Sequence, residues 1–264
     1  MQLRVWQHLL KKEIQILKEN SLKSLNKIST VASIGGGPIG AGWAAHFLAK
    51  GLNVKCYVHS VNEIDDYKSL IKTAWETLEK LGIDETASLE KMQIFTNLKE
   101  SLTEVDFVQE SIPEILNVKQ DFYSQIDFLL NPSVIIASST SGLLISDIVK
   151  NCNTRDRAIV GHPFNPPYLL PLVEVVASEY TKKQFVDQAV NFYKAVGKVP
   201  IVLKKEIPGF IATRLQEALW REALHMVAND EATPEQIDLA LINGPAPRMA
   251  YQGQCMAFHV ACGE

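Results

Sequence analysis

The stretch that decides the fold runs from residue 31 to residue 40 and reads Val31-Ala-Ser-Ile34-Gly-Gly-Gly-Pro-Ile-Gly40. A short apolar strand leads into a glycine-rich turn, and a helical pattern follows to about Lys50. The turn matches GxGxxG, and a strand before it with a helix after it is the context in which this pattern binds a dinucleotide. The glycines allow a tight turn, close approach of a pyrophosphate and packing of helix on strand. The predicted cofactor site comprises Gly35, Gly36, Gly37, Pro38, Ile39 and Gly40.

Beyond this turn, apolar runs of strand length alternate with stretches of helical pattern. The expected strands are 54–58, 92–95, 106–108, 134–137, 158–160, 172–176 and 199–203, with helices at 62–81, 116–130 and 181–196. This alternation predicts a Rossmann-type α/β fold, a doubly wound and mostly parallel sheet with helices on both faces.

After residue 206 only helices are expected, at 210–228 and 234–242. Thr233 is the predicted N-cap of the second of these, with Pro234 at its first position. The sequence therefore predicts two domains, a Rossmann-type domain over 31–206 and a smaller all-α C-terminal domain over 207–264. Residues 1–30 carry apolar side chains at helical spacing and are expected to form an amphipathic N-terminal extension, with a targeting peptide as the alternative.

The composition excludes several classes of protein. A formal net charge of −4 over 264 residues gives no support to a nucleic-acid partner. No apolar run approaches the roughly 18 to 20 residues that cross a bilayer. The four cysteines form no CxxC pair, which favours reduced thiols over disulfides or metal ligands. We therefore expect a cytoplasmic protein that acts on a small molecule, without a metal.

Polar residues interrupt the later strands at Ala137-Ser-Ser-Thr-Ser-Gly-Leu143, Gly161-His-Pro-Phe-Asn-Pro166 and Pro171-Leu-Val-Glu-Val175. Residues 208–227 read PGFIATRLQEALWREALHMV and residues 248–253 read RMAYQG. Together these motifs resemble the 3-hydroxyacyl-CoA dehydrogenase superfamily, and more closely its L-carnitine dehydrogenase branch. The likeness runs from about residue 31 to the end of the chain. It implies NAD-dependent oxidation of the 3-hydroxyl of L-carnitine to 3-dehydrocarnitine by a homodimer.

The resemblance also implies catalytic roles for His162, Glu174 and Ser141. Hydride can leave an alcohol carbon only as the hydroxyl proton is removed, and histidine is the natural base near neutral pH. A carboxylate on the second ring nitrogen fixes the tautomer and stabilises the imidazolium, which suits Glu174. Ser141 is expected to hydrogen-bond the reacting oxygen. Glu114 and Lys119 match cofactor-contacting positions of the superfamily.

Each of these residues also has a simpler interpretation. His162 precedes a proline and could belong to a turn, Ser141 could cap a helix, and Lys119 could lie at a solvated helix start. A serine hydrolase is a further alternative, but it needs a GxSxG elbow that the surroundings of Ser141 do not provide.

The chain departs from the superfamily pattern in three places. Val58 stands where an acidic residue that binds the ribose is expected, and Glu63, Asp65 and Asp66 follow only on the next predicted helix. No Arg is there to favour a 2′-phosphate, so NAD is expected over NADP, with weak discrimination. Thr213 stands where the superfamily often has Asn near the substrate oxygen, and a hydroxyl offers one donor where an amide offers two. The chain also ends at Glu264, before the usual C-terminal helical region, so the helical domain is expected to be truncated.

The helix expected after Phe210 carries candidate substrate contacts. Thr213, Glu217 and Trp220 share one face of it, and an aromatic ring beside a carboxylate suits a trimethylammonium group. Tyr251 and Phe258 could extend this cage, and Arg248 or Arg221 could meet the substrate carboxylate. The alternative places Trp220 in the core and Glu217 in solvent. Oxidation of L-gulonate or a 3-hydroxyacyl-CoA, or a catalytically impaired nucleotide-binding relative, remain alternative functions.

Overall fold

The computed structural model describes residues 28–263, and the expected extension over residues 1–30 lies almost wholly outside them. The chain divides after Phe210 into two compact units. We describe each unit by itself. No helix of the described residues is long and apolar enough to cross a membrane.

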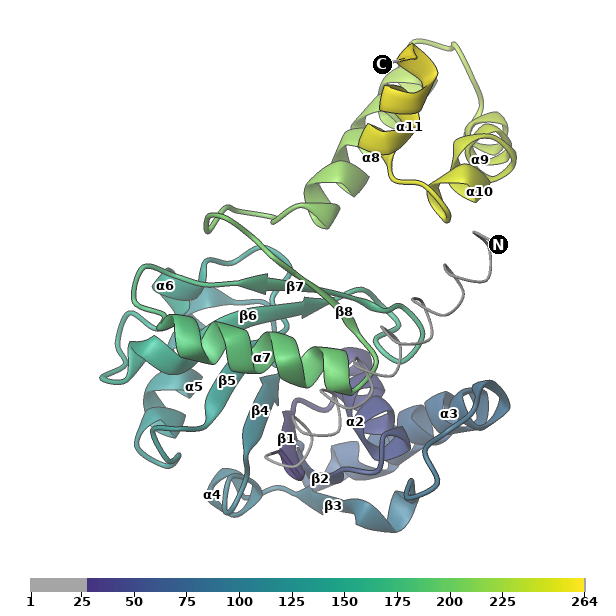
Figure 1. The fold of residues 1–264 in the computed structure, drawn as a ribbon. Helices are drawn as coiled ribbons and strands as arrows, with labels where there is room; N and C mark the ends of the chain where they lie inside the picture. The colour runs from purple at the N-terminus through teal and green to yellow at the C-terminus, as the bar shows by residue number, and fades with distance from the viewer. Residues whose placement is uncertain (1–27, 264) are drawn as a thin grey trace, which may run out of the picture. The chain divides into compact units, whose positions relative to one another are not determined.

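The first unit is built on one eight-stranded sheet with the order β3-β2-β1-β4-β5-β6-β7-β8 (Figure 1). The strands are β1 (Thr30–Ile34), β2 (Asn53–Tyr57), β3 (Met92–Phe95), β4 (Phe107–Glu110), β5 (Ile135–Ser138), β6 (Ala158–Pro163), β7 (Leu172–Val176) and β8 (Val199–Val202). Only the pairing of β6 with β7 is antiparallel. The segment between β6 and β7 contains no helix, and a parallel crossover needs one or a connection of similar length.

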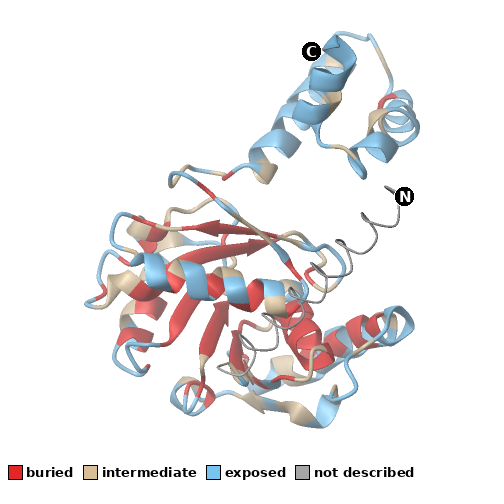
Figure 2. Ribbon diagram, in the orientation of Figure 1, coloured by how far each residue is buried: buried red, intermediate tan, exposed pale blue. Residues whose placement is uncertain are grey.

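Helices cover both faces of this sheet because alternate strand residues point to opposite sides. On one face, Val31 and Ile159 pack with α2 (Pro38–Ala49), α3 (Ile64–Leu81) and α7 (Lys183–Ala195). On the other, Ala32 and Val160 pack with α5 (Leu116–Asp127) and α6 (Ile145–Ile148). Figure 2 shows the central strands and α2 buried, whereas α3 and α7 have both buried and exposed residues. The arrangement confirms the Rossmann-type prediction.

Short elements that the sequence pattern did not predict complete this unit. They are α4 (Leu98–Ser101) and three single turns of 3₁₀ helix, η1 (Val61–Glu63), η2 (Leu89–Lys91) and η3 (Arg155–Arg157). Ser60 caps η1 by accepting a hydrogen bond from the Asn62 amide at 3.3 Å. Glu63 therefore ends a separate turn before α3, where the sequence placed it on the helix itself.

The second unit is entirely helical. It contains α8 (Ala212–Ala228), α9 (Pro234–Asn243), α10 (Pro245–Met249) and α11 (Gln254–Cys262), of which only α8 and α9 were expected. Thr233 caps α9 as predicted, in a capping box completed by Gln236. The helix expected from residue 210 begins two residues later because Phe210 adopts φ +50°, which no α-helix contains.

Candidate active site

The candidate site lies where the parallel strands β1, β4, β5 and β6 end. Residues at these ends are neighbours in the sheet: Ile34 pairs with Glu110, Glu110 with Ser138, and Ser138 with Val160. The strand order reverses between β1 and β4, and such a switch point is where open α/β sheets bind their ligands.

The glycine-rich turn after β1 fits the pyrophosphate of a dinucleotide. Gly35 has φ +119°, and a Cβ there would lie 2.4 Å from the carbonyl oxygen of Ser111. A Cβ on Gly40 would lie 2.1 Å from the Gly35 oxygen, so both positions need glycine for packing alone. Gly37 differs, because a Cβ on it would meet no atom within 4 Å. The open space beside Gly37 leaves room for a phosphate at the start of α2, a helix end without a side-chain cap.

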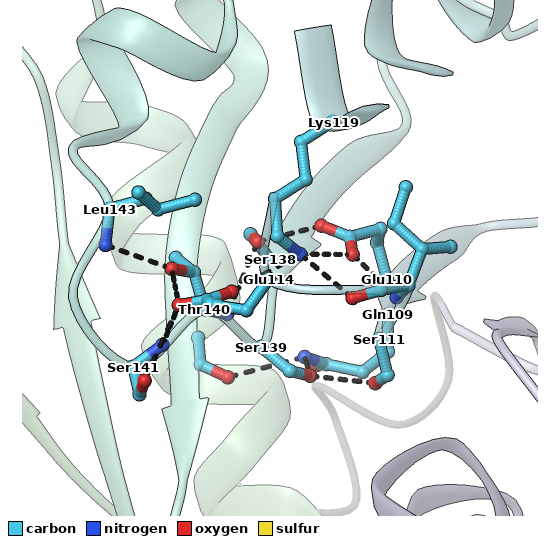
Figure 3. A network of polar contacts seen from close by, with 12 residues as sticks. Gln109, Glu110, Ser111, Glu114, Lys119, Ser138, Ser139, Thr140, Ser141 and Leu143 are labelled. Atoms are coloured by element: carbon cyan, nitrogen blue, oxygen red, sulfur yellow. Dashed lines mark hydrogen bonds and ion pairs between the residues drawn. The ribbon is translucent and has the colours of Figure 1, made fainter. Parts of the chain in front are cut away.

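A buried ion pair lies beneath this edge. Lys119 Nζ donates to Glu110 Oε1 at 2.6 Å, and the two side chains are 1% and 0% exposed. Glu110 also accepts from the Ile112 amide at 2.7 Å and from the Ser138 hydroxyl at 2.6 Å. Figure 3 shows Lys119 pointing into this cluster. Lys119 is thus buried, so the alternative interpretation, a solvated helix start, is wrong for its side chain.

Glu114 connects the ion pair to the loop after β5. Its Oε2 lies 3.6 Å from Lys119 Nζ, and its Oε1 accepts from the Ser141 amide at 2.8 Å and the Thr140 hydroxyl at 2.5 Å (Figure 3). Thr140 Oγ1 in turn accepts from the Leu143 amide at 3.0 Å. Thr140 therefore shapes this turn. Helix α6 has no side-chain cap, so Ser141 is not a helix cap; its side chain is exposed, and its hydroxyl donates to Glu114 Oε1 at 3.3 Å.

His162 and Glu174 are paired across the two antiparallel strands. They face each other in the register of β6 and β7, and His162 Nδ1 lies 2.8 Å from Glu174 Oε2. Glu174 is fully buried and His162 is 7% exposed. His162 lies in a strand, so the turn alternative is wrong. The geometry directs the carboxylate to Nδ1, the arrangement that fixes a histidine tautomer.

Aromatic rings enclose the His162 imidazole. The rings of Phe164 and Phe210 lie with centroids 5.5 Å and 5.6 Å from it. The amide of Gly209, next to Phe210, donates to the Gly142 carbonyl at 3.4 Å. The Gly209–Phe210 segment therefore contacts both the imidazole of His162 and the loop that carries Ser141.

The remaining predicted residues belong to the second unit. Thr213, Glu217 and Trp220 lie along α8, Arg248 lies in α10, and Tyr251 follows it. Trp220 is 58% exposed, so it is not in the core of its own unit. Tyr251 is exposed as well.

Sequence reasoning missed Glu110 and Gln109, which end β4. Gln109 Nε2 donates to the carbonyl oxygen of Gly161 at 3.2 Å, and Gln109 Oε1 accepts from the Tyr193 hydroxyl at 2.6 Å. Both residues are fully buried, and Gln109 thereby bonds the backbone next to His162. A sequence signal for them was present, because polar residues in a buried strand need hydrogen-bonding partners.

A dinucleotide turn at the switch point, beside a buried histidine–carboxylate pair, defines a nicotinamide-dependent dehydrogenase. Comparison with known families agrees. Residues 30–207 match the NAD binding domain of 3-hydroxyacyl-CoA dehydrogenase, and residues 209–261 match its C-terminal domain. The chain belongs to the 3-hydroxyacyl-CoA dehydrogenase family and is an NAD-dependent oxidoreductase.

Several similar proteins are named for a particular enzymatic activity. L-carnitine dehydrogenase of Nocardiopsis dassonvillei is 47% identical over 94% of this chain and 75% of its own, and that of Streptomyces coelicolor is 45% identical over 92% and 76%. Among solved structures, 5-formyl-3-hydroxy-2-methylpyridine 4-carboxylic acid 5-dehydrogenase, an NAD⁺-dependent dismutase, matches with a TM-score of 0.83 and 31% identity over 89% and 76% of the chains. (S)-3-hydroxybutyryl-CoA dehydrogenase from Ralstonia eutropha gives 0.73 and 28% over 81% and 76%.

Proposed function

We propose that this protein oxidises the 3-hydroxyl of L-carnitine to 3-dehydrocarnitine with NAD as hydride acceptor. The observation that supports the proposal is the buried His162–Glu174 pair. It belongs to the same sheet as β1, the strand that leads into the glycine-rich turn. The choice of substrate rests on the relatives named L-carnitine dehydrogenase, which are 40% to 47% identical to the chain.

In the proposed reaction, His162 takes the hydroxyl proton on Nε2. Glu174 holds the Nδ1 proton and stabilises the positive charge that the ring gains, because its buried carboxylate lies at hydrogen-bonding distance. Ser141 and Thr213 hydrogen-bond the reacting oxygen. NAD supplies the acceptor for the hydride that leaves C3.

The other site residues have binding roles in this proposal. Gly35 to Gly40 hold the pyrophosphate, and Glu114 contacts the cofactor from the loop after β4. Lys119 acts through Glu114, because its ammonium is already bonded to carboxylates and its side chain is 1% exposed. Glu217 and Trp220 would hold the trimethylammonium group with Tyr251, and Arg248 would bind the substrate carboxylate.

We further propose a cytoplasmic homodimer with a domain division at residues 206 and 207. Cys56, Cys152, Cys255 and Cys262 are all free thiols, which suits a reducing compartment. Exposed apolar side chains recur along α8 and α11, as on surfaces that associate. They are Leu215, Leu219, Trp220, Leu224, Met256, Phe258 and Val260. Sedimentation analysis of the purified protein tests the dimer.

A substrate panel tests the proposed function. The rate of NADH formation is measured with L-carnitine, L-gulonate and 3-hydroxybutyryl-CoA at equal concentrations. The proposal predicts the highest kcat/KM for L-carnitine. A higher value for either other substrate would assign the chain to a sister activity, and no turnover with any of them, while NADH still binds, would indicate an impaired relative.

A further inference from the structure

The position that should bind the adenosine ribose of NAD is occupied by an apolar residue. In this fold an acidic residue at the end of the second strand accepts hydrogen bonds from the ribose hydroxyls. Val58 directly follows β2 here, and its side chain is fully buried. His59 and Ser60 follow it, and no Lys or Arg lies between Tyr57 and Asp66 to favour a 2′-phosphate instead.

A carboxylate reaches the same place from further along the chain. The turn η1, capped by Ser60, follows β2, and the Glu63 amide donates to the Ser60 carbonyl at 3.1 Å. Glu63 Oε2 accepts from the His59 amide at 3.3 Å. Within residues 28–263 no ion pair involves Glu63, and this half-buried side chain has acceptor sites beyond the one used by the His59 amide.

The glycine-rich turn makes room for this carboxylate. A Cβ on Gly36 would lie 2.6 Å from Glu63 Oε2, a distance that real Cβ atoms do not reach. The GxGxxG pattern leaves position 36 open to any residue, and the backbone there is not in the left-handed region. Neither the fingerprint nor the backbone therefore requires Gly36, but a side chain at this position would force the Glu63 carboxylate to move. Since the Gly35 amide donates to the Tyr57 carbonyl at 3.0 Å, the turn and the end of β2 are also bonded to each other.

We propose that Glu63 supplies the carboxylate that binds the adenosine ribose hydroxyls of NAD and disfavours the 2′-phosphate of NADP, with Gly36 as the space that admits it. The adenosine end of the cofactor passes the exit of β2 in this fold, between the glycine-rich turn and that exit. Glu63 lies against both. The specificity residue has thus moved from the strand end to the following turn, and the cofactor preference does not depend on Val58.

Cofactor binding tests this proposal without any substrate, so its outcome is separate from the question of L-carnitine. Dissociation constants of NADH and NADPH are measured by fluorescence titration for wild type, Glu63→Gln and, as a matched control, Asp65→Asn on the exposed side of α3. Glu63→Gln should weaken NADH binding about tenfold and narrow the preference over NADPH, because a charge-assisted hydrogen bond is lost. Asp65→Asn should change neither constant more than about twofold.

A second variant separates position from charge. Gly36→Ala keeps the carboxylate but displaces it, so it should weaken NADH binding as Glu63→Gln does, and the double variant should bind no worse than either single variant. The proposal is overturned if Glu63→Gln binds NADH and NADPH as wild type does, or if the two substitutions weaken binding additively. Should Glu63→Gln fail to fold, wild type is titrated with the 2′-deoxyadenosine analogue of NADH. Affinity equal to that for NADH would overturn the proposal equally.

Discussion

Replacing Lys119 with methionine should destabilise the first unit, because it leaves the Glu110 carboxylate buried without its cation. Breaking a buried ion pair on one side costs about 3 to 5 kcal/mol. Glu110 retains two donors, the Ile112 amide and the Ser138 hydroxyl. Those remaining hydrogen bonds place the expected loss of unfolding free energy near the lower value, about 3 kcal/mol.

Urea denaturation followed by the fluorescence of the buried Trp43 and Trp75 measures this loss. The double variant Glu110→Gln/Lys119→Met removes both charges and should recover much of the stability, to within about 1 kcal/mol of wild type. Lys182→Met is the control, because it breaks an ion pair of 2.7 Å at a lysine that is 64% exposed and should cost less than about 1 kcal/mol. A Lys119→Met loss no larger than that of the control, or a double variant less stable than the single, would refute the reasoning.

Glu174→Gln removes the negative charge beside the imidazole, so it should lower kcat by about two to four orders of magnitude while leaving the NADH dissociation constant unchanged. An unchanged kcat in stopped assays of NADH formation would contradict this. Burial, with repulsion from Lys50, lowers the pKa of Lys198 to about 8 from 10.5. Between pH 8 and 10.5 the Lys198 amine is therefore protonated in the unfolded chain but not in the folded one, and the free energy of unfolding should rise by up to about 3 kcal/mol over this range. Urea titrations of Lys198→Met should show no such rise. An identical rise in the variant would show that Lys198 is not its cause. Trp220→Ala should raise KM for L-carnitine without changing NADH binding, and an equal KM would remove Trp220 from the substrate site.

Much of the fold follows from local pattern. The strands expected at 92–95 and 172–176 are present with those bounds, and Gly35 and Gly40 occupy the packed positions that the fingerprint assigns to them. Such features depend on residues close in sequence, whose periodicity and turn chemistry the pattern records directly. The antiparallel pairing of β6 with β7 could also have been predicted from the sequence, because the connection between them is too short for a parallel crossover.

The polar contacts of the site were harder to predict. The sequence predicted Lys119 as a cofactor contact, with a solvated helix start as the alternative, and did not predict its ion pair with Glu110. That pair depends on tertiary packing between β4 and α5. The sequence pattern placed Glu63 on the helix after β2, together with Asp65 and Asp66, and gave no reason to choose it over them. The position of the Glu63 side chain depends on the conformation of the short turn η1. A single 3₁₀ turn produces no recognisable hydrophobic periodicity, so the sequence did not predict it.

The most direct test of the proposed chemistry is the rate of NADH formation from L-carnitine by His162→Gln. Glutamine retains a polar side chain of similar length but cannot take up a proton near neutral pH. With His162 as the base, turnover should fall by at least about a hundredfold while NADH binds with the affinity of wild type. Turnover within a few-fold of wild type would show that another group removes the hydroxyl proton.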